Sequence, residues 1–429
     1  MALLNPSGWG NLGDAAIIES TKEGLRAASR EPCHFLLITL NPFDSAQRHA
    51  EPAVELTTRS KPKYPVAARS FWRLWKAVPP GVTRTAPDNS GIESYRWLPY
   101  RVRKWINACL APTLEVAHFL VCLRYMARMD LLVIAGGGQL DDYWGGARGH
   151  PLSLWKWSLA AALCRTRIVF ASVGTGSIRT RESEYFLRNA LARASYVSAR
   201  DPRSLQTVRS TLNCHSATLA PDMAFHLRMA AQWRADLSRH GDRQHATVTV
   251  SPIAWRHPRL WPDAAIEPYN LYIMNLAAAI EALLDDRIAV RIIRSDTADV
   301  YAVDDLVAAV TARRPDCYGN KLQRIDTDTI ESFLSQVGES DLLIASRLHS
   351  VILAQACGVA VVAISYDWKV DEQMKACNTL EQTVQISTFT TEEVLSLVHA
   401  RLSTNPPSPT PLPQGWPDVL TRQFASLIA

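Results

Sequence analysis

The sequence predicts an α/β protein with two domains, each built on a parallel sheet with crossover helices. The chain has 429 residues, roughly three times the size of a typical domain. Short apolar runs alternate with segments of helical periodicity along most of its length. Several of these runs lead directly into glycine-rich or charged turns, which is where open parallel sheets bind ligands.

In the first half, each apolar run ends at a turn residue, which is typical of a buried strand. The expected strands are Ala2–Leu4, Phe35–Leu40, Leu131–Ala135, Ile168–Ser172, Tyr196–Ser198 and the approach to Asp222. Helical periodicity predicts helices at Ala15–Ser29, Ser153–Cys164 and Glu182–Ala194.

The second half repeats this alternation. The expected strands are Ala246–Pro252, Ile288–Arg294, Asp341–Ser346 and Ala360–Ser365. The expected helices are Tyr269–Leu284, Val303–Arg313, Ile330–Val337 and Leu348–Cys357. The polar stretch Gln232–Gln244 interrupts the pattern, and Asn405–Pro417 has six prolines in thirteen residues. We therefore expect an N-terminal domain over 1–230, a C-terminal domain over 231–404, and a Pro-rich tail with a last helix over 405–429.

A segment at about 42–128 is much longer than a crossover needs, and it predicts an insertion. It contains Trp72, Trp75, Trp97 and Trp105 among the basic residues Arg69, Arg73, Lys76, Arg96, Arg101, Arg103 and Lys104. One interpretation is a packed subdomain whose charges face water. The others are contact with a membrane surface, a saccharide or a nucleic acid.

Composition narrows the classes of partner and compartment. The 46 basic and 41 acidic residues give a net charge of +5, too mild to indicate a nucleic-acid partner. The eight cysteines include no CxxC pair, which favours reduced thiols over disulfides or a zinc site. No run reaches the ~18 apolar residues of a membrane span, and the N-terminus lacks signal-peptide features. We expect a cytoplasmic protein.

The segment Gly8–Asp14 follows the first strand and carries three glycines. Backbone amides in such a turn can approach an anion or a sugar. The alternative is a tight turn in which Asp14 caps the following helix. The segment also matches the GxGxxG pattern of dinucleotide-binding proteins, but the next strand ends at Leu40-Asn41 and not at an acidic residue.

Two more glycine turns and an arginine follow later strands of the same half. The turns are Gly136–Gly138 and Gly174–Gly176, and the arginine is Arg200, followed by Asp201. Three such turns in one sheet favour a ligand cleft that is floored by backbone amides. Arg200 either points into this cleft or pairs with Asp201 or another neighbour.

In the second half, Arg347 and His349 lie in a turn between an apolar strand and a helix. This is a suitable place to bind an anion and move a proton. Lys369 occupies the equivalent place after the next strand. Because Arg347 lies in a turn, we expect its replacement to weaken ligand binding with little loss of packing.

Taken in order, these motifs resemble the polysaccharide pyruvyl transferase family. They are NLGD at 11–14, GGG-x-x-D at 136–141, GxG at 174–176, the Arg200-Asp201 and Pro221-Asp222 turns, RLH at 347–349 and YD-x-K at 366–369. The resemblance runs from residue 5 to about 372, except for the long insertion.

The resemblance implies two Rossmann-like domains that face each other across a cleft, as in GT-B glycosyltransferases, with helices on both faces of each sheet. It implies that phosphoenolpyruvate binds in the cleft, that Arg200 and Arg347 bind its anionic groups, and that His349 and Asp14 are catalytic. Further substrate contacts are expected from Asn11, Gly137, Gly138, Gly176, Leu348, Ser350 and Lys369.

The chemistry of phosphoenolpyruvate agrees with these roles. Its carboxylate and phosphate suit bidentate arginines. A pyruvyl ketal forms when the methylene carbon is protonated and C2 accepts a sugar hydroxyl. His349 is a suitable general acid, and Asp14, from the N-terminal domain, would accept the hydroxyl proton. We expect no cofactor and no metal. The partners would be phosphoenolpyruvate and a glycan acceptor for exopolysaccharide or cell-surface glycan, either free or on a lipid carrier at the inner face of the cytoplasmic membrane.

Three other functions remain open at this point. A GT-B glycosyltransferase that uses a nucleotide sugar would share the architecture. A non-catalytic saccharide-binding relative would not need the Asp14, Arg200, Arg347 and His349 set. An NAD-dependent oxidoreductase would need an acidic ribose ligand after the second strand.

Overall fold

The chain forms two compact units. The computed structural model describes residues 1–58, 77, 79–80, 100–143, 145–235, 246–261, 264–317, 319, 321–403, 412–413 and 415–428, with the backbone alone for 100–110 and 417. Unit 1 contains Met1–Trp9, Ile17–Met223 and Asp418–Ala429, and unit 2 contains Gly10–Ala16 and Ala224–Pro417. The fold class predicted from the sequence, α/β with a parallel sheet in each half, is confirmed.

Unit 1 is built on a seven-stranded parallel sheet with the strand order β3-β2-β1-β4-β5-β6-β7. Its strands are β1 (Ala2–Leu4), β2 (Leu36–Thr39), β3 (Ala53–Glu55), β4 (Leu131–Ala135), β5 (Arg167–Val173), β6 (Tyr196–Ala199) and β7 (Thr218–Leu219). The strands β1 and β4 are apolar and buried at every position because helices cover both faces of the sheet.

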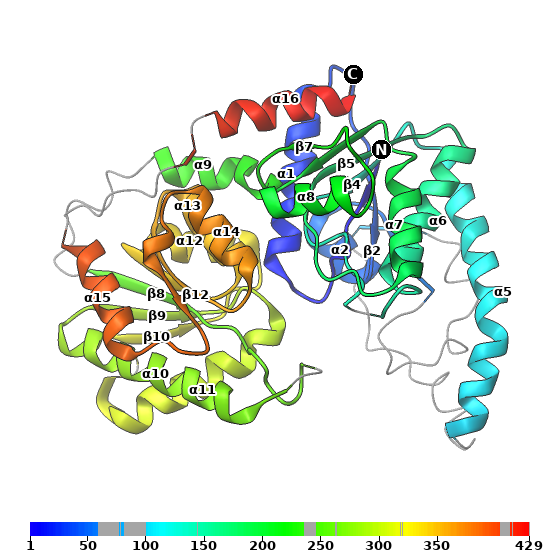
Figure 1. Ribbon diagram of the computed structural model, residues 1–429. Helices are drawn as coiled ribbons and strands as arrows, with labels where there is room; N and C mark the ends of the chain where they lie inside the picture. Colours follow the sequence, from blue (N-terminus) through cyan, green and yellow to red (C-terminus); the bar gives the residue numbers. More distant parts are fainter. Residues whose placement is uncertain are drawn as a thin grey trace. The chain divides into compact units, whose positions relative to one another are not determined.

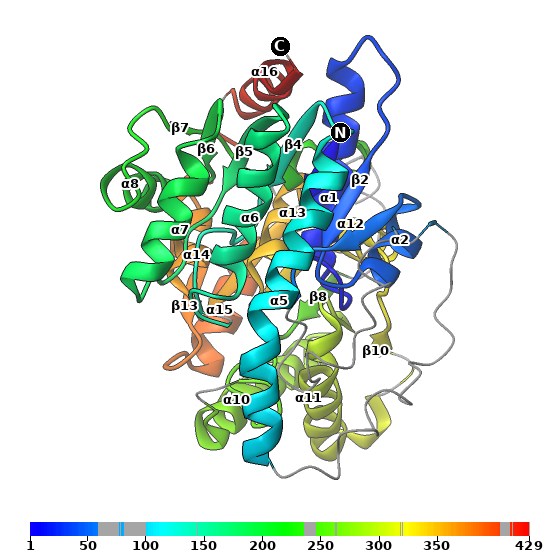
Figure 2. The same cartoon turned by 90° about the vertical axis from the view of Figure 1, so that its right-hand side faces the viewer.

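The helices of unit 1 are α1 (Leu12–Ala28), α2 (Pro42–His49), α5 (Tyr100–Met126), α6 (His150–Leu163), α7 (Arg181–Leu191), α8 (Pro202–Ser210) and α16 (Trp416–Ile428). Figure 2 shows α5, α6 and α7 side by side. The terminal helix α16, red in Figure 1, packs against α1, where the ring of Phe424 meets the α carbon of Gly24.

Unit 2 is built on a six-stranded parallel sheet with the order β10-β9-β8-β11-β12-β13. Its strands are β8 (Thr247–Ser251), β9 (Ala289–Ile293), β10 (Leu322–Ile325), β11 (Leu342–Ala345), β12 (Ala360–Ser365) and β13 (Thr383–Gln385). Its helices are α9 (Arg228–Ala235), α10 (Ile266–Asp285), α11 (Val300–Arg313), α12 (Ile330–Gly338), α13 (Leu348–Cys357), α14 (Trp368–Ala376) and α15 (Thr391–Leu402). In Figure 1, α10, α11 and α15 cover one face of this sheet, and α12, α13 and α14 cover the other.

Four single turns of 3-10 helix complete the described elements. They are η2 (Met223–His226), η4 (Thr297–Asp299), η5 (Pro315–Cys317) and η6 (Leu380–Gln382). Local signals in the sequence fix several helix ends. Thr329 begins α12 with a capping box, and Gly358 ends α13 in the left-handed conformation, with a φ of 81°.

Each sheet has one place where the strand order reverses direction. In unit 1 this place lies between β1 and β4, and in unit 2 it lies between β8 and β11. The loops that leave two such strands run to opposite sides, so a crevice opens outside their carboxyl ends, and ligands of open α/β sheets bind there. The glycine turns after β1 and β4 and the Arg347 turn after β11 all lie at these reversal points.

The range predicted for the insertion, about 42–128, starts too early in the sequence. Residues 42–55 form α2 and β3, and β3 pairs with β2 in the sheet. The strand was missed because it has only three residues and one of them is charged. Trp72, Trp75, Trp97, Arg69, Arg73, Lys76 and Arg96 lie outside the described residues. Trp105, Arg101, Arg103 and Lys104 belong to α5, in the part described by its backbone alone.

The unit boundaries also differ from the expected division at 230/231. The main division falls between Met223 and Ala224, Gly10–Ala16 group with unit 2, and α16 returns to unit 1. No described helix is long and apolar enough to cross a membrane. The cysteines whose side chains are described are all free thiols.

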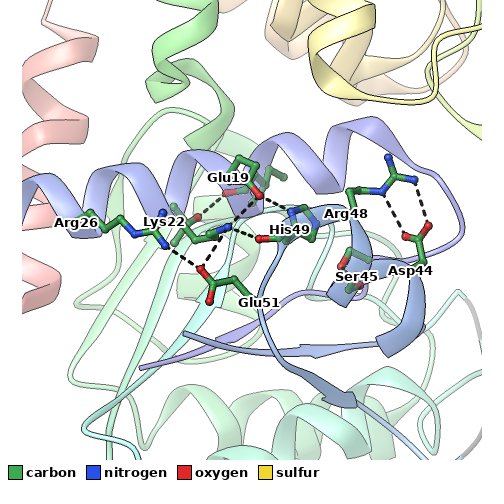
Figure 3. A network of polar contacts seen from close by, with 11 residues as sticks. Glu19, Lys22, Arg26, Asp44, Ser45, Arg48, His49 and Glu51 are labelled. Carbon is green, nitrogen blue, oxygen red and sulfur yellow. Dashed lines mark hydrogen bonds and ion pairs between the residues drawn. The ribbon is translucent and has the colours of Figure 1, made fainter. Parts of the chain in front are cut away.

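A buried network of charges holds α1 against α2 and the turn before β3 (Figure 3). The ammonium of Lys22, a residue only 4% exposed, lies 3.1 Å from Glu19 and 3.6 Å from Glu51, and it donates to the carbonyl of His49 (2.8 Å). His49 and Glu19 share a hydrogen bond of 2.6 Å. Burial alone would raise the pKa of Glu19, but His49 and Lys22 outweigh it and lower that pKa.

Candidate functional site

The glycine turn after β1 is anchored to the residues of unit 2. The Leu12 N–H donates to the carbonyl of Ser295 (2.9 Å), and the α carbon of Gly10 packs against Thr297. The side chain of Asn11 accepts from the N–H groups of Gly13 (2.9 Å) and Asp14 (3.2 Å). Asn11, and not Asp14, therefore caps α1, which begins at Leu12 and not at Ala15. Asp14 lies in the first helical turn, where the helix dipole favours a carboxylate.

His349 lies directly against this helical turn. A Cβ atom added to Gly13 would overlap the Cβ, Cγ and Nδ1 atoms of His349. Gly13 thus leaves the space that the imidazole occupies, and Asp14 is the next residue along α1. The expectation that Asp14 belongs to the opposite domain from His349 is wrong, because the turn Gly10–Ala16 packs with unit 2.

Arg347 is held in a fork by a buried carboxylate. Its Nε and Nη2 atoms donate to the two carboxylate oxygens of Asp299, each at 2.8 Å, and Asp296 lies 3.6 Å from Nη2. Burial alone would lower the pKa of Arg347, but Asp299 and Asp296 outweigh it and raise that pKa. Arg347 is therefore a permanent cation at the start of α13, and Nη1 is not used in the fork. The bidentate pair also contradicts the expectation that replacing Arg347 would cost little packing.

Beneath Arg347 and His349 lies a cluster of buried hydroxyl groups. Ser350 donates to Ser295 (2.8 Å) and shares a hydrogen bond of 3.1 Å with Ser251. Tyr272 shares a bond of 3.2 Å with Ser346. Ser350 is fully buried, so its role is to tie the ends of β8, β9 and α13 together. Leu348 begins α13 and is half-buried.

Lys369 lies in the first turn of α14. Its N–H is capped by Asp367 (3.0 Å), and its ammonium lies 5.8 Å from the ring centroid of Trp368. The residue follows β12, the neighbour of β11, so it shares the carboxyl edge of the unit 2 sheet with Arg347 and His349.

In unit 1 the glycine turns after β4 and β5 are hydrogen-bonded to each other. The N–H of Gly174 donates to the carbonyl of Gly137 (2.7 Å), and the N–H of Gly176 donates to the carbonyl of Leu140 (3.0 Å). The N–H of Gly176 is thus already hydrogen-bonded within the protein, so it cannot bind a ligand as expected. Gly137 is buried in the left-handed conformation with a φ of 68°, whereas Gly138 is exposed.

Buried polar side chains connect β1 and β4 at the reversal point of unit 1. Asn5 and Gln139 are fully buried, and both donate to the carbonyl of Ala135, at 2.8 and 3.3 Å. Gln139 also bonds His150 Nε2 (2.9 Å). Burial lowers the pKa of His150 to about 4, so this imidazole is neutral and donates to the Gln139 oxygen.

Arg200 is also paired with carboxylates. Its Nη1 donates to Asp222 (3.1 Å), and its Nε lies 3.7 Å from Asp201. Asp201 caps α8 and also accepts from the hydroxyl of Ser204 (2.7 Å). The ion pair expected as one of two roles for Arg200 is therefore present. The Arg200–Asp222 pair in unit 1 resembles the Arg347–Asp299 pair in unit 2: each arginine follows a strand and binds a buried aspartate from a neighbouring loop.

The predicted residues thus fall into two groups. Unit 2 brings together Asn11, Asp14, Arg347, His349 and Ser350 at its carboxyl edge, with Lys369 on the next loop, whereas Gly137, Gly138, Gly176 and Arg200 belong to unit 1. Asp299 and Ser295 could not be found from the sequence, because no motif marks them and only the fold brings them to Arg347 and Ser350. The segment Trp255–Trp261 was also missed. It follows the strand β8 directly, and residues directly after a parallel strand are candidates for ligand binding. The described residues contain no group of three or more side chains that could hold a metal.

Comparison with known proteins adds a family and a fold. A model of the polysaccharide pyruvyl transferase family matches residues 11–367. No curated protein matches the chain. Among solved structures, UDP-GlcNAc 2-epimerase from Methanocaldococcus jannaschii superposes with a TM-score of 0.57 at 10% identity, covering 100% of this chain and 99% of the other. The UDP-GlcNAc 2-epimerase from Neisseria meningitidis superposes with a TM-score of 0.55 at 9% identity, covering 100% and 99%. At such identities the likeness describes the fold alone.

Proposed function

Because the chain belongs to the polysaccharide pyruvyl transferase family, we propose that it transfers a pyruvyl group from phosphoenolpyruvate to two hydroxyls of a sugar, as a ketal. The observation that carries this proposal is the contact of His349 with the first turn of α1, beside the permanently charged Arg347. An acid for the donor, a carboxylate for the acceptor and a cation for the anionic groups then lie in one unit.

Arg347 is proposed to bind an anionic group of phosphoenolpyruvate. The fork to Asp299 uses Nε and Nη2, which fixes the plane of the guanidinium and leaves Nη1 for the ligand. An arginine that is already oriented loses little side-chain entropy on binding. Arg200 is proposed as a second anion-binding arginine, oriented in the same way by Asp222.

His349 is proposed to protonate the methylene carbon of phosphoenolpyruvate. The new C–H bond turns the methylene into a methyl group and leaves C2 open to attack. A sugar hydroxyl adds to C2, and Asp14 accepts its proton. Phosphate then leaves with the electrons of the C2–O bond. The second hydroxyl attacks C2 and gives its proton to the released phosphate, which closes the ketal ring. The packing against Gly13 fixes the imidazole ring for its transfer.

The acceptor is proposed to be a glycan of exopolysaccharide or cell-surface glycan synthesis, either free or carried on a lipid. With a lipid carrier, the enzyme would act in the cytoplasm at the inner face of the cytoplasmic membrane. The chemistry requires no cofactor other than the donor itself.

Titration calorimetry with phosphoenolpyruvate tests this assignment. The wild-type protein should bind it, and His349→Gln should bind it within about threefold while losing about 10²–10⁴-fold in turnover. UDP serves as the competing ligand. If UDP binds and phosphoenolpyruvate does not, the chain is a glycosyltransferase of similar architecture, and the proposal is wrong.

A further inference from the structure

The loop that leaves β8 lies at the reversal point of the unit 2 sheet, beside the loop that leaves β11. The strand order reverses between β8 and β11, so the loops that leave the carboxyl ends of these two strands flank the position where open α/β sheets bind ligands. The β11 loop carries Arg347 and His349. The β8 loop carries the segment Trp255–Trp261, with the sequence Trp-Arg-His-Pro-Arg-Leu-Trp. We call this segment the aromatic loop.

The aromatic loop is held by the same carboxylate that orients Arg347. The N–H of Ala254, just before the loop, donates to Asp299 Oδ1 (3.1 Å), the atom that also accepts from Arg347 Nη2. The N–H of Ile253 donates to the hydroxyl of Tyr272 (3.2 Å), which belongs to the cluster of buried hydroxyl groups beneath Arg347. The start of the loop and the arginine are therefore fixed relative to each other through one buried residue.

Aromatic rings gather along this loop at the sheet edge. His257 stacks on Tyr301, with centroids 4.8 Å apart and planes at 14°. The guanidinium of Arg259 lies 5.4 Å from the same tyrosine ring. Further along, Trp261 meets Tyr366 edge to face at 6.1 Å. His257, Tyr301 and Trp261 are half-buried and Arg259 is exposed, so the rings keep surface that a ligand can cover.

The loop offers hydrogen-bond donors without a dense positive charge. Burial is the main cause that lowers the pKa of His257, with Arg259 adding to it and Asp305 opposing it. The ring is therefore neutral at pH 7, and its Nδ1 accepts from the N–H of Arg259 (3.3 Å). Nε2 then carries the proton and is a donor. The second guanidinium of the loop, that of Arg256, is half-buried and lies 5.2 Å from the ring centroid of Trp255. A neutral donor, one exposed guanidinium and several ring faces fit a polyhydroxyl ligand better than a compact trianion.

We propose that the aromatic loop binds the acceptor glycan, with a pyranose ring stacked on its aromatic side chains. A pyranose has an apolar C–H face and a rim of hydroxyls, so it needs a ring to stack on and donors at the edge. Ketal formation joins two hydroxyls of one sugar to a single carbon, and a sugar held by its face leaves two neighbouring hydroxyls of its rim free to react. The proposal rests on the proposed function and names its second substrate.

Saturation-transfer NMR with the methyl glycosides of glucose, galactose, mannose and N-acetylglucosamine tests the aromatic loop directly. The wild-type protein should transfer saturation to the ring C–H protons of at least one glycoside. Tyr301→Leu, which keeps apolar bulk, should lower the affinity for that glycoside at least about tenfold, because removal of a stacking ring typically costs that much binding. Arg259→Gln, at an exposed position, should weaken it less. Both variants should bind phosphoenolpyruvate as the wild type does.

The matched control is Tyr185→Leu on α7 of unit 1, a tyrosine that is 57% exposed and distant in sequence from the loop. It should leave glycoside binding unchanged. The proposal is overturned if no glycoside binds the wild type, or if Tyr301→Leu and Arg259→Gln both bind the glycoside normally. It is also overturned if both variants lose affinity for phosphoenolpyruvate as well as for the glycoside. It is also overturned if UDP displaces the glycoside and loses affinity in Tyr301→Leu, since the loop would then bind a nucleotide. Glycoside binding without phosphoenolpyruvate binding would support the loop and refute the donor assignment, so the two failures are distinct.

Discussion

The imidazole of His349 occupies the space that a side chain at residue 13 would fill, so Gly13 and His349 are complementary in shape. The N-terminal glycine motif and the C-terminal RLH motif are more than three hundred residues apart in the chain, yet they meet at this contact. The glycine is needed for close approach, and Asn11 caps the helical turn that presents it.

Gly13→Ala should therefore act through His349. With His349 present, the added methyl group should lower the free energy of unfolding by about 1–3 kcal/mol, as overpacking does, and should reduce turnover. With His349→Gly, which removes the Cβ atom as well as the ring, the overlap is gone, and the same change should stabilise the protein by up to about 1 kcal/mol, as Gly→Ala does inside a helix. Denaturant unfolding of the four proteins measures this. An equal effect in both backgrounds would show that the contact is unimportant.

Arg347→Ala should destabilise the protein as well as weaken anion binding. It leaves Asp299, which is fully buried, without its guanidinium, at a cost of about 3–5 kcal/mol. The double variant Arg347→Ala, Asp299→Ala should recover part of this loss. Urea unfolding with calorimetric titration separates the two effects. A loss of stability below about 1 kcal/mol for the single variant would mean that the fork contributes little.

His150 should make the protein less stable as the pH falls below neutrality. Its pKa in the folded protein is about 4, below the 6.5 of an unfolded chain. Between these values the unfolded state binds more protons, so stability is lost as the pH falls from about 6.5 to about 4. At about 1.4 kcal/mol per unit of pKa, the loss amounts to at most about 3 kcal/mol. Stability curves of the wild type and His150→Gln should converge toward low pH, and parallel curves would refute this.

The network in Figure 3 contains a matched pair of tests. Lys22→Met removes a buried cation between two glutamates, one of which is also bound by Arg26 and the other by His49, and should cost about 2–4 kcal/mol. Arg48→Met removes a half-buried i,i+4 pair with Asp44 and should cost less, about 1 kcal/mol or below. Thermal unfolding compares the two. Equal costs would indicate that the burial of Lys22 has no energetic weight.

Much of the fold could be predicted from the sequence because buried parallel strands are continuous apolar runs. The strands Ala2–Leu4 and Leu131–Ala135 and the helix Leu348–Cys357 have the predicted bounds. The edge strands β3, β10 and β13 were missed because they are short and carry polar residues, so their pairing depends on the neighbouring strand. Helix α1 begins three residues earlier than predicted because Asn11, and not Asp14, is the cap.

The candidate site was only partly predictable. The motifs identify Arg347 and His349 because charged residues after a strand are unusual, whether or not their partners are known. Asp299 lies forty-eight residues before Arg347, in a turn with no motif, and only the fold brings the two together. The placement of Gly10–Ala16 with unit 2 is likewise a tertiary contact, made through Ser295 and His349.

The most direct test of pyruvyl transfer is to incubate the protein with phosphoenolpyruvate and a panel of free and lipid-linked saccharides in heavy water. Mass spectrometry after return to ordinary water should show one acceptor heavier by pyruvate minus water, with one deuterium retained in the ketal methyl group. His349→Gln should form this product about 10²–10⁴-fold more slowly. No gain on any acceptor in the presence of phosphoenolpyruvate, or a ketal methyl without deuterium, would contradict the proposed reaction.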